Sequence, residues 1–420
     1  MRRQKRRQSL CPALPLALPL ALPLALPLAL PLALSLGLSL SAWTGAARAA
    51  PRVPSIDDEV LERLPVKAAD PRMAEVDRLR QALRRHPDDA DIAVALARRY
   101  FDLVGAEGDP RFVGYAQAAL GPWWNETHPP QRVRVMRAVL QQFNHRFAAA
   151  LDDLSSVVRE DPADAEAWAW LAAVHMVQAD YSAARQDCEH LAPFTTSLFA
   201  TACIANVDSV TGRAGSAATA MREALRASPQ ATPAARLWVL TRLGEIEERR
   251  GMYREAEAAY REALAVGIDD FYLLAAYADF LLDRGRAPEV LQLLKDRSRA
   301  DVLLLRLALA ANAVKAVTAA AYGRDLEARF DAARRRGDAT HQKEEARFAL
   351  ALQNQPQRAL ALALENYAVQ REPADARILL EASMAARRPD AAEPVLKWIS
   401  QTNIESVVLQ SLAQRLRELR

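Results

Sequence analysis

Glycine is scarce in this sequence, with 14 residues among 420. Folds built from strands and tight turns use glycine wherever the chain adopts a positive φ, so this shortage argues against them. Alanine, leucine, arginine and glutamate recur throughout instead, and these residues favour helices. The composition therefore predicts an all-α fold.

Motifs of catalysis and metal binding are also missing. The sequence contains no G-x-S-x-G, no G-x-x-x-x-G-K-[ST] and no G-x-G-x-x-G, and its six histidines form no H-E-x-x-H. We therefore predict no catalytic residue, no cofactor and no metal ion. An enzyme is the least favoured function class, with a site assembled from distant residues left open.

The slight excess of positive charge belongs to the first 49 residues. The whole chain carries a formal net charge of +3, from 55 basic and 52 acidic residues. Residues 1–49 hold six of the basic residues and no acidic one, which leaves 49 basic against 52 acidic residues. A remainder with a net charge of −3 gives no basis for nucleic-acid binding.

Residues 1–49 have the three parts of a secretory signal peptide. The cationic "MRRQKRRQ" precedes a low-complexity "LPLA" core, and "SAWTGAARAA" follows with small residues suited to cleavage between Ala49 and Ala50. We therefore expect a periplasmic or secreted protein of a bacterial envelope. Because the apolar core is longer than usual, an uncleaved membrane anchor is the alternative, although its prolines at every fourth position disfavour a straight spanning helix.

A spacing of about 34 residues recurs through the middle of the chain. In a unit that begins at Leu237, Gly244, Gly251, Ala256 and Tyr260 occupy positions 8, 15, 20 and 24. Units that begin at 131, 165, 198 and 271 repeat the pattern, and the extra residues before 237 are assigned to a loop, "TPAAR". This pattern resembles the tetratricopeptide-repeat family, in which each repeat is a helix–turn–helix.

The resemblance implies a right-handed superhelical solenoid of antiparallel helix pairs. We divide the chain into a signal peptide (1–49), N-terminal helical repeats with the insertion "VGAEGDPRFVGY" (50–130), a regular array (131–304) and degenerate repeats (305–420). The last segment, from Ile404 to Leu419, has a single apolar stripe and is predicted to be a C-terminal capping helix.

In such solenoids the first helix of each pair lines a concave groove that binds a partner. The resemblance places nine candidate residues in this groove: Phe199, Asn206, Trp238, Thr241, Glu245, Glu248, Arg249, Tyr272 and Asp279. Their aromatic members are suited to anchoring an extended or helical peptide. The alternative is that these aromatic residues only pack between neighbouring first helices.

Two further pairs of residues are candidates outside the groove. Trp123 and Trp124, in "GPWWNETHPP", could anchor a partner or a membrane interface, or at least one of them could seal the core. Cys188 and Cys203 lie on either side of the turn "PFTTS". They could form a disulfide, or they could be two small buried hydrophobic residues.

The sequence as a whole predicts an exported scaffold that binds a partner protein or peptide of the cell envelope in its groove. Such a scaffold would assist the assembly or export of an envelope component. The alternative is a membrane-anchored structural subunit of an envelope complex, with membrane contact only if the N-terminal segment is retained. The sequence does not identify the partner or the oligomeric state.

Overall fold

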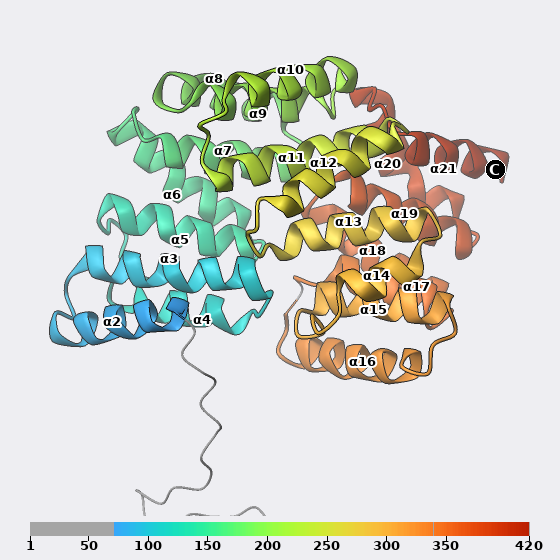
Figure 1. Cartoon of the computed structure of the whole chain (residues 1–420), viewed down its shortest axis with the longest axis horizontal. Helices are drawn as coiled ribbons and strands as arrows, with labels where there is room; N and C mark the ends of the chain where they lie inside the picture. Colours follow the sequence, from blue (N-terminus) through green and yellow to red (C-terminus); the bar gives the residue numbers. More distant parts are fainter. Residues whose placement is uncertain (1–70, 339, 420) are drawn as a thin grey trace, which may run out of the picture. The chain divides into compact units, whose positions relative to one another are not determined.

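Helices account for all the regular secondary structure that can be described. The computed structural model describes residues 71–338 and 340–419, and these form 20 α-helices, three short 3-10 helices and no strand (Figure 1). The all-α prediction is confirmed. The signal peptide, the Ala49–Ala50 cleavage site and the alternative membrane anchor lie outside the described residues.

The α-helices follow one another with short connections. In the first half of the array they are α2 (Pro71–Arg85), α3 (Ala90–Glu107), α4 (Arg111–Ala119), α5 (Gln131–Phe143), α6 (Phe147–Glu160), α7 (Ala165–Val177), α8 (Tyr181–Leu191), α9 (Ser197–Asp208), α10 (Ala214–Ala227), α11 (Pro233–Arg249) and α12 (Tyr253–Ala265). In the second half they are α13 (Phe271–Asp283), α14 (Ala287–Leu293), α15 (Asp301–Ala313), α16 (Ala319–Arg335), α17 (Gln342–Ala351), α18 (Pro356–Val369), α19 (Pro373–Ala385), α20 (Glu393–Thr402) and α21 (Val407–Glu418).

The helices are arranged as consecutive antiparallel pairs. Each odd-numbered helix from α3 to α19 contacts the even-numbered helix that follows it, and it also contacts the next odd-numbered helix. The odd-numbered helices therefore form one continuous inner layer that extends to α21 (Figure 1). This is the array of helix pairs that the tetratricopeptide-repeat resemblance predicted.

The predicted unit boundaries agree with the helix boundaries except at one place. Helices α5, α7 and α13 begin at residues 131, 165 and 271, and α9 begins one residue before 198. The assignment of "TPAAR" to a loop is wrong, because α11 begins at Pro233. Thr232 caps this helix by accepting a hydrogen bond from the Ala235 amide at 3.3 Å, and proline is favoured at the first helical position.

Small residues allow the two helices of a pair to approach closely. Position 8 is Ala138, Ala172, Ala205, Gly244 or Ala278 in the five regular units, and all five are buried. A Cβ atom added to Gly244 would lie 2.6 Å from Cε1 of Tyr260. The ring of Tyr260, at position 24, therefore fills the space that glycine leaves on the facing helix.

A left-handed backbone conformation follows the first helix of each pair. It is adopted at position 15 of the regular units by His145, Ala179, Gly212, Gly251 and Gly285. The same conformation recurs at Lys315, Asn354 and Arg387, after α15, α17 and α19. The repeated backbone therefore continues into residues 305–420, where the characteristic side chains are lost.

The C-terminal helices return to the middle of the array. The Arg371 amide donates to the Val177 carbonyl at 2.7 Å, and Nε1 of Trp398 donates to the Tyr181 hydroxyl at 3.1 Å. Next to α21, Glu405 accepts a hydrogen bond from the Ala214 amide at 2.9 Å. These contacts join segments that are about 190 to 220 residues apart in the sequence, and they place α19–α21 across the inner layer.

The predicted capping helix is present but does more than cover an end. Ile404, Leu412 and Leu416 of the predicted stripe are buried, whereas Val407 and Leu419 are exposed. Leu409, which lies outside the predicted stripe, is buried and faces the inner layer.

Candidate functional site

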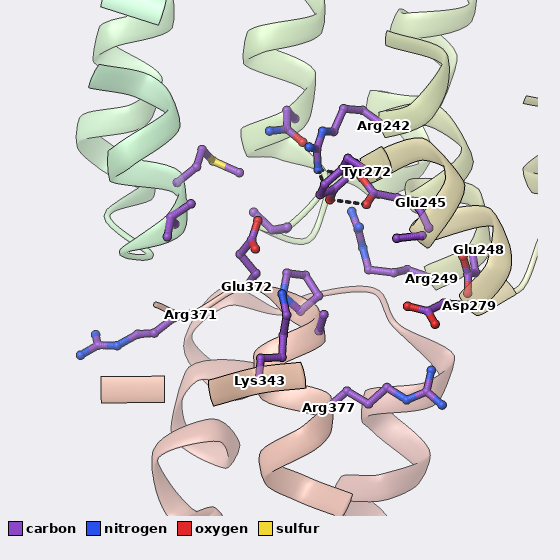
Figure 2. Close-up of a pocket in the computed structure, with 18 of the residues that line it drawn as sticks. Arg242, Glu245, Glu248, Arg249, Tyr272, Asp279, Lys343, Arg371, Glu372 and Arg377 are labelled. Carbon is purple, nitrogen blue, oxygen red and sulfur yellow. Dashed lines mark hydrogen bonds and ion pairs between the residues drawn. The ribbon is translucent and has the colours of Figure 1, made fainter. Parts of the chain in front are cut away.

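A cavity of about 490 Å³ lies on the inner layer of the array. Side chains from every odd-numbered helix between α7 and α21 line it. Figure 2 shows α11 and α13 supplying one wall and the segment around α17 and α19 supplying the facing wall. The degenerate C-terminal repeats thus convert the expected open groove into a partly enclosed cavity.

Eight of the nine predicted groove residues line this cavity. They are Phe199, Asn206, Trp238, Glu245, Glu248, Arg249, Tyr272 and Asp279. Thr241 does not line it: the residue is 3% exposed, and its hydroxyl donates to the Leu237 carbonyl of its own helix at 2.8 Å. Its placement in the groove is therefore corrected.

The aromatic residues combine the two roles that the sequence left as alternatives. The rings of Phe199 and Trp238 lie 5.0 Å apart between centroids and join α9 to α11, and both rings also face the cavity. This contact is of the kind that stabilises neighbouring helices by about 1 kcal/mol. It leaves an apolar surface at the start of α11.

Tyr272 of α13 belongs to a polar cluster with Arg242 and Glu245, which lie one to two turns beyond Trp238 on α11. Arg242 Nη1 donates to Glu245 Oε2 and to the Tyr272 hydroxyl, both at 2.8 Å, and that hydroxyl donates to Glu245 Oε1 at 2.6 Å (Figure 2). The guanidinium also lies 4.5 Å from the centroid of the Tyr272 ring. Burial raises the pKa of Tyr272 above its ordinary value, so the hydroxyl stays protonated and keeps donating.

Asp279 is held between two arginines. Arg306 donates to its carboxylate at 2.5 and 3.1 Å, and Arg347 Nη1 donates to it at 2.6 Å. Burial opposes ionisation of Asp279, but the two guanidinium charges outweigh it and hold its pKa well below the ordinary value. Asp279 therefore links α13 to α15 and α17 and is fully committed to these partners.

Glu248 has the opposite electrostatic environment. Burial raises its pKa to about 8, although the Tyr260 hydroxyl donates to Oε2 at 2.9 Å. Both Asp279 and Asp283 add like charge near it. Glu248 is therefore largely protonated at neutral pH, and it presents a neutral carboxyl group to the cavity.

The facing wall is built by residues that the sequence pattern did not reveal. Arg377 of α19 donates to both carboxylate oxygens of Asp283 at 2.5 and 2.8 Å, across 94 residues of sequence. Lys343 Nζ lies 3.7 Å from Oδ1 of the buried Asp375. Burial raises the pKa of Asp375 to about 6, and its carboxylate accepts hydrogen bonds from Asn366 Nδ2 at 2.9 Å and from the Glu372 amide at 2.8 Å.

The paired tryptophans do not form an exposed anchor. Trp123, in a 3-10 turn (Gly121–Trp123), is 8% exposed, and Trp124 is partly buried against the same N-terminal core. Arg137 fixes this loop by donating to the Trp124 and Glu126 carbonyls at 2.9 Å. The structure thus shows the arrangement in which a tryptophan seals the core.

The two cysteines form a disulfide in the structure. Cys188 of α8 and Cys203 of α9 have Cα atoms 5.6 Å apart, within the range of ordinary disulfides. Both cysteines line the cavity. The bond therefore fixes the connection between two successive repeats beside the site.

The part of the chain that the structure describes contains neither a group of side chains suited to a metal ion nor a helix suited to spanning a membrane. Between residues 71 and 419, with residue 339 left aside, His, Cys, Asp and Glu form no group of three that could hold a metal ion. None of the helices in the same range combines the length and the hydropathy needed to cross a bilayer.

Comparison with known proteins gives similarity at the level of fold only. No family model and no curated protein matches the sequence. Among solved structures, the chain is similar to the Cut9–Hcn1 hetero-tetramer of the APC/C (TM-score 0.41, 13% identity), where the match covers 82% of this chain and 58% of that one. It is also similar to a tetratricopeptide repeat protein from Parabacteroides merdae (TM-score 0.34, 14% identity, covering 74% and 99%). A third similar structure is the human IFIT1 dimer with m7Gppp-AAAA (TM-score 0.38, 11% identity, covering 83% and 85%). The assignment of a helical-repeat scaffold rests on the helix pairs of this chain itself.

Proposed function

We propose that the protein is an exported helical-repeat scaffold that binds an extended segment of an envelope protein in its cavity. The cavity between the inner layer and the C-terminal repeats is the observation that carries this proposal. Helical-repeat arrays present concave surfaces on which extended partners can lie. An aromatic surface beside polar and charged groups supplies both anchoring and orientation for such a segment.

The size of the cavity favours an extended segment over a helical one. A helix of 10–12 Å diameter with a pitch of 5.4 Å occupies roughly 400–600 Å³ per turn. The volume of about 490 Å³ would therefore hold about one turn of a helix. A few extended residues fit the same space and leave their backbone groups free to bond with the polar walls.

The proposed cellular role of the scaffold rests on the sequence of its N-terminal segment. The predicted signal peptide supports a periplasmic or secreted adaptor that assists the assembly or export of an envelope component. The length of the same apolar segment supports the alternative, a subunit anchored in the membrane. N-terminal sequencing of the purified protein distinguishes them, because an adaptor would begin at Ala50 and an anchored subunit at Met1.

Blocking the cavity tests the binding role directly. Ala173 of α7 lines the cavity, so Ala173→Trp would fill it without removing a polar contact. Ala118→Trp places the same side chain on the exposed surface of α4 and serves as the control. We expect the parent and the control to capture the same envelope protein from solubilised membranes, and the Ala173→Trp variant to lose it. Capture of that protein by a folded Ala173→Trp variant would show that it binds elsewhere.

A further inference from the structure

Arg249 is a cation in the cavity wall that lacks an anionic partner. Its Nη2 donates to the Ser209 hydroxyl at 2.9 Å, and its buried Nε has no hydrogen-bond partner. No carboxylate among residues 71–338 and 340–419 lies within ion-pair distance of the guanidinium. A guanidinium stays charged in proteins, and leaving it unpaired away from water is costly.

The other cations of the cavity already have partners. Five of them lie within 4 Å of a carboxylate: Arg242, Arg306, Lys343, Arg347 and Arg377. Arg371 is exposed, and Figure 2 shows it pointing away from the other labelled side chains. Among the buried cations of the cavity, Arg249 is therefore the one whose charge a bound anionic ligand would neutralise.

The neighbouring carboxyl groups do not supply that anion. Glu248 is adjacent in sequence but is largely protonated, as described above. Glu245 attracts Arg249 from beyond ion-pair distance, but its two oxygens are bound by Arg242 and Tyr272. The acidic side chains of Glu344 and Glu372 also line the cavity. The negative charge of Glu245 near Arg249 favours a ligand with a single negative charge over one with two.

The position of Arg249 relative to the aromatic surface sets the shape of the ligand. Trp238 and Arg249 both belong to α11 and are separated by eleven residues, which corresponds to about 16 Å along the helix. Between them on the same helix, Arg242 and Glu245 are bonded to each other and to Tyr272. Apolar side chains of other helices, among them Leu305 and Leu409, also line the cavity. A volume of about 490 Å³ lies within the range of small-molecule sites.

We propose that the cavity also binds a small amphiphilic monocarboxylic acid, whose carboxylate pairs with Arg249 and whose apolar tail extends towards Phe199 and Trp238. A guanidinium matches a carboxylate with two parallel hydrogen bonds. The two terminal nitrogens of Arg249 can supply them, because Nη2 has a second hydrogen besides the one that it gives to Ser209. This inference goes beyond the proposed function, because the ligand is a small molecule and no partner protein is required. The acid and a partner segment would compete for the cavity.

Calorimetric titration with decanoate and with 1-decanol tests the proposal on the purified chain. The two probes share an apolar tail and differ in the charged group. We expect decanoate to bind at least tenfold more tightly, because a charge-assisted hydrogen bond contributes about 1.5–3 kcal/mol and 1.4 kcal/mol is a factor of ten in affinity. Equal binding of the two probes, or binding of neither, would overturn the proposal.

Two variants assign the preference to Arg249. Arg249→Met removes the guanidinium, so the variant is expected to bind decanoate and 1-decanol with similar affinity. Arg371→Gln, in the same cavity, is expected to keep the parent's preference within twofold. A preference that survives Arg249→Met, or that Arg371→Gln also abolishes, would overturn the assignment.

The thermal midpoint gives an independent readout. Arg249→Met is expected to unfold at a higher temperature than the unliganded parent, since it removes an unpaired charge. Decanoate should raise the thermal midpoint of the parent by more than it raises that of Arg249→Met. A large fall in the midpoint on Arg249→Met would show instead that Arg249 has a structural role. Partner capture is measured separately, so failure of either proposal leaves the other to be judged on its own result.

Discussion

Replacing Gly244 with alanine tests whether close contact between paired helices stabilises this array. The added Cβ would lie 2.6, 2.8 and 2.9 Å from three atoms of the Tyr260 ring. Non-bonded carbon atoms prefer a separation of about 3.5–4.0 Å, so the ring or the helix would have to move by about 1 Å. Neither can move easily, because Tyr260 is fully buried and contacts the rings of Tyr277 and Phe280 at 5.6 and 5.8 Å.

The expected loss of stability is the difference between two effects. Overpacking of a well-packed interior costs about 1–3 kcal/mol, and three close atoms place this site at the upper end. Exchange of glycine for alanine within a helix raises the free energy of unfolding by about 1 kcal/mol, because alanine has the higher helix propensity. We therefore expect Gly244→Ala to lower the free energy of unfolding by about 1–2 kcal/mol.

Gly323 provides the matched control, because it lies within α16 and a Cβ there would meet no atom within 4 Å. Gly323→Ala should gain helix propensity and raise the free energy of unfolding by up to about 1 kcal/mol. Urea unfolding followed by circular dichroism measures both variants, provided that their m values agree. If the two variants were equally stable within about 0.5 kcal/mol, the close contact with Tyr260 would not be a determinant of stability.

Three further predictions concern the repeats and the site. Lys315→Gly should raise the free energy of unfolding by about 0.5–1 kcal/mol in the same assay. Lys315 is exposed and adopts φ 54°, a conformation that costs a non-glycine residue about 1–2 kcal/mol. A variant less stable than the parent would contradict this prediction. Replacement of both Cys188 and Cys203 with alanine should lower the free energy of unfolding by about 3 kcal/mol, the value expected for a closed loop of about 15 residues. A reducing agent should lower the stability of the parent and leave that of the double variant unchanged. The raised pKa of Glu248, about 8, means that the folded state holds a proton which the unfolded state loses near pH 4.3. Its contribution to stability is therefore fully present below pH 4, falls as the pH rises, and is lost above pH 8. Glu248→Gln should match the parent at pH 4 and exceed it at pH 9 by on the order of 5 kcal/mol, and a constant difference across this range would refute the assignment.

The helix pairs could be predicted because their signals are local. Gly244 and Tyr260 lie within one unit of the repeat, and the spacing between them already indicates two antiparallel helices in contact. The start of α11 was missed for an equally local reason, because Thr232 and Pro233 favour helix initiation but were assigned to a loop. A threonine followed by proline is a common start of a helix, and this pair marks the boundary in the sequence.

The candidate site could be predicted in part. Eight of the nine residues taken from the first helices of the repeats do line the cavity, since the inner face of a helix is set by its own periodicity. Thr241 fails because a threonine can bond to its own helix and pack between neighbours. The facing wall was not predicted, because Arg377 and Asp283 are 94 residues apart in the sequence and come into contact only in the folded chain.

The sequence by itself determined the repeating unit: two helices, small residues where they meet and a left-handed residue between them. Each of these features depends on contacts within about 34 residues, so spacing alone reveals them. Tertiary structure decided that α19–α21 cross the inner layer, that Asp279 binds Arg347 68 residues further along the chain, and that Arg249 has no carboxylate partner. These outcomes depend on the small rotation accumulated from one repeat to the next, which brings distant side chains together without leaving a local pattern in the sequence.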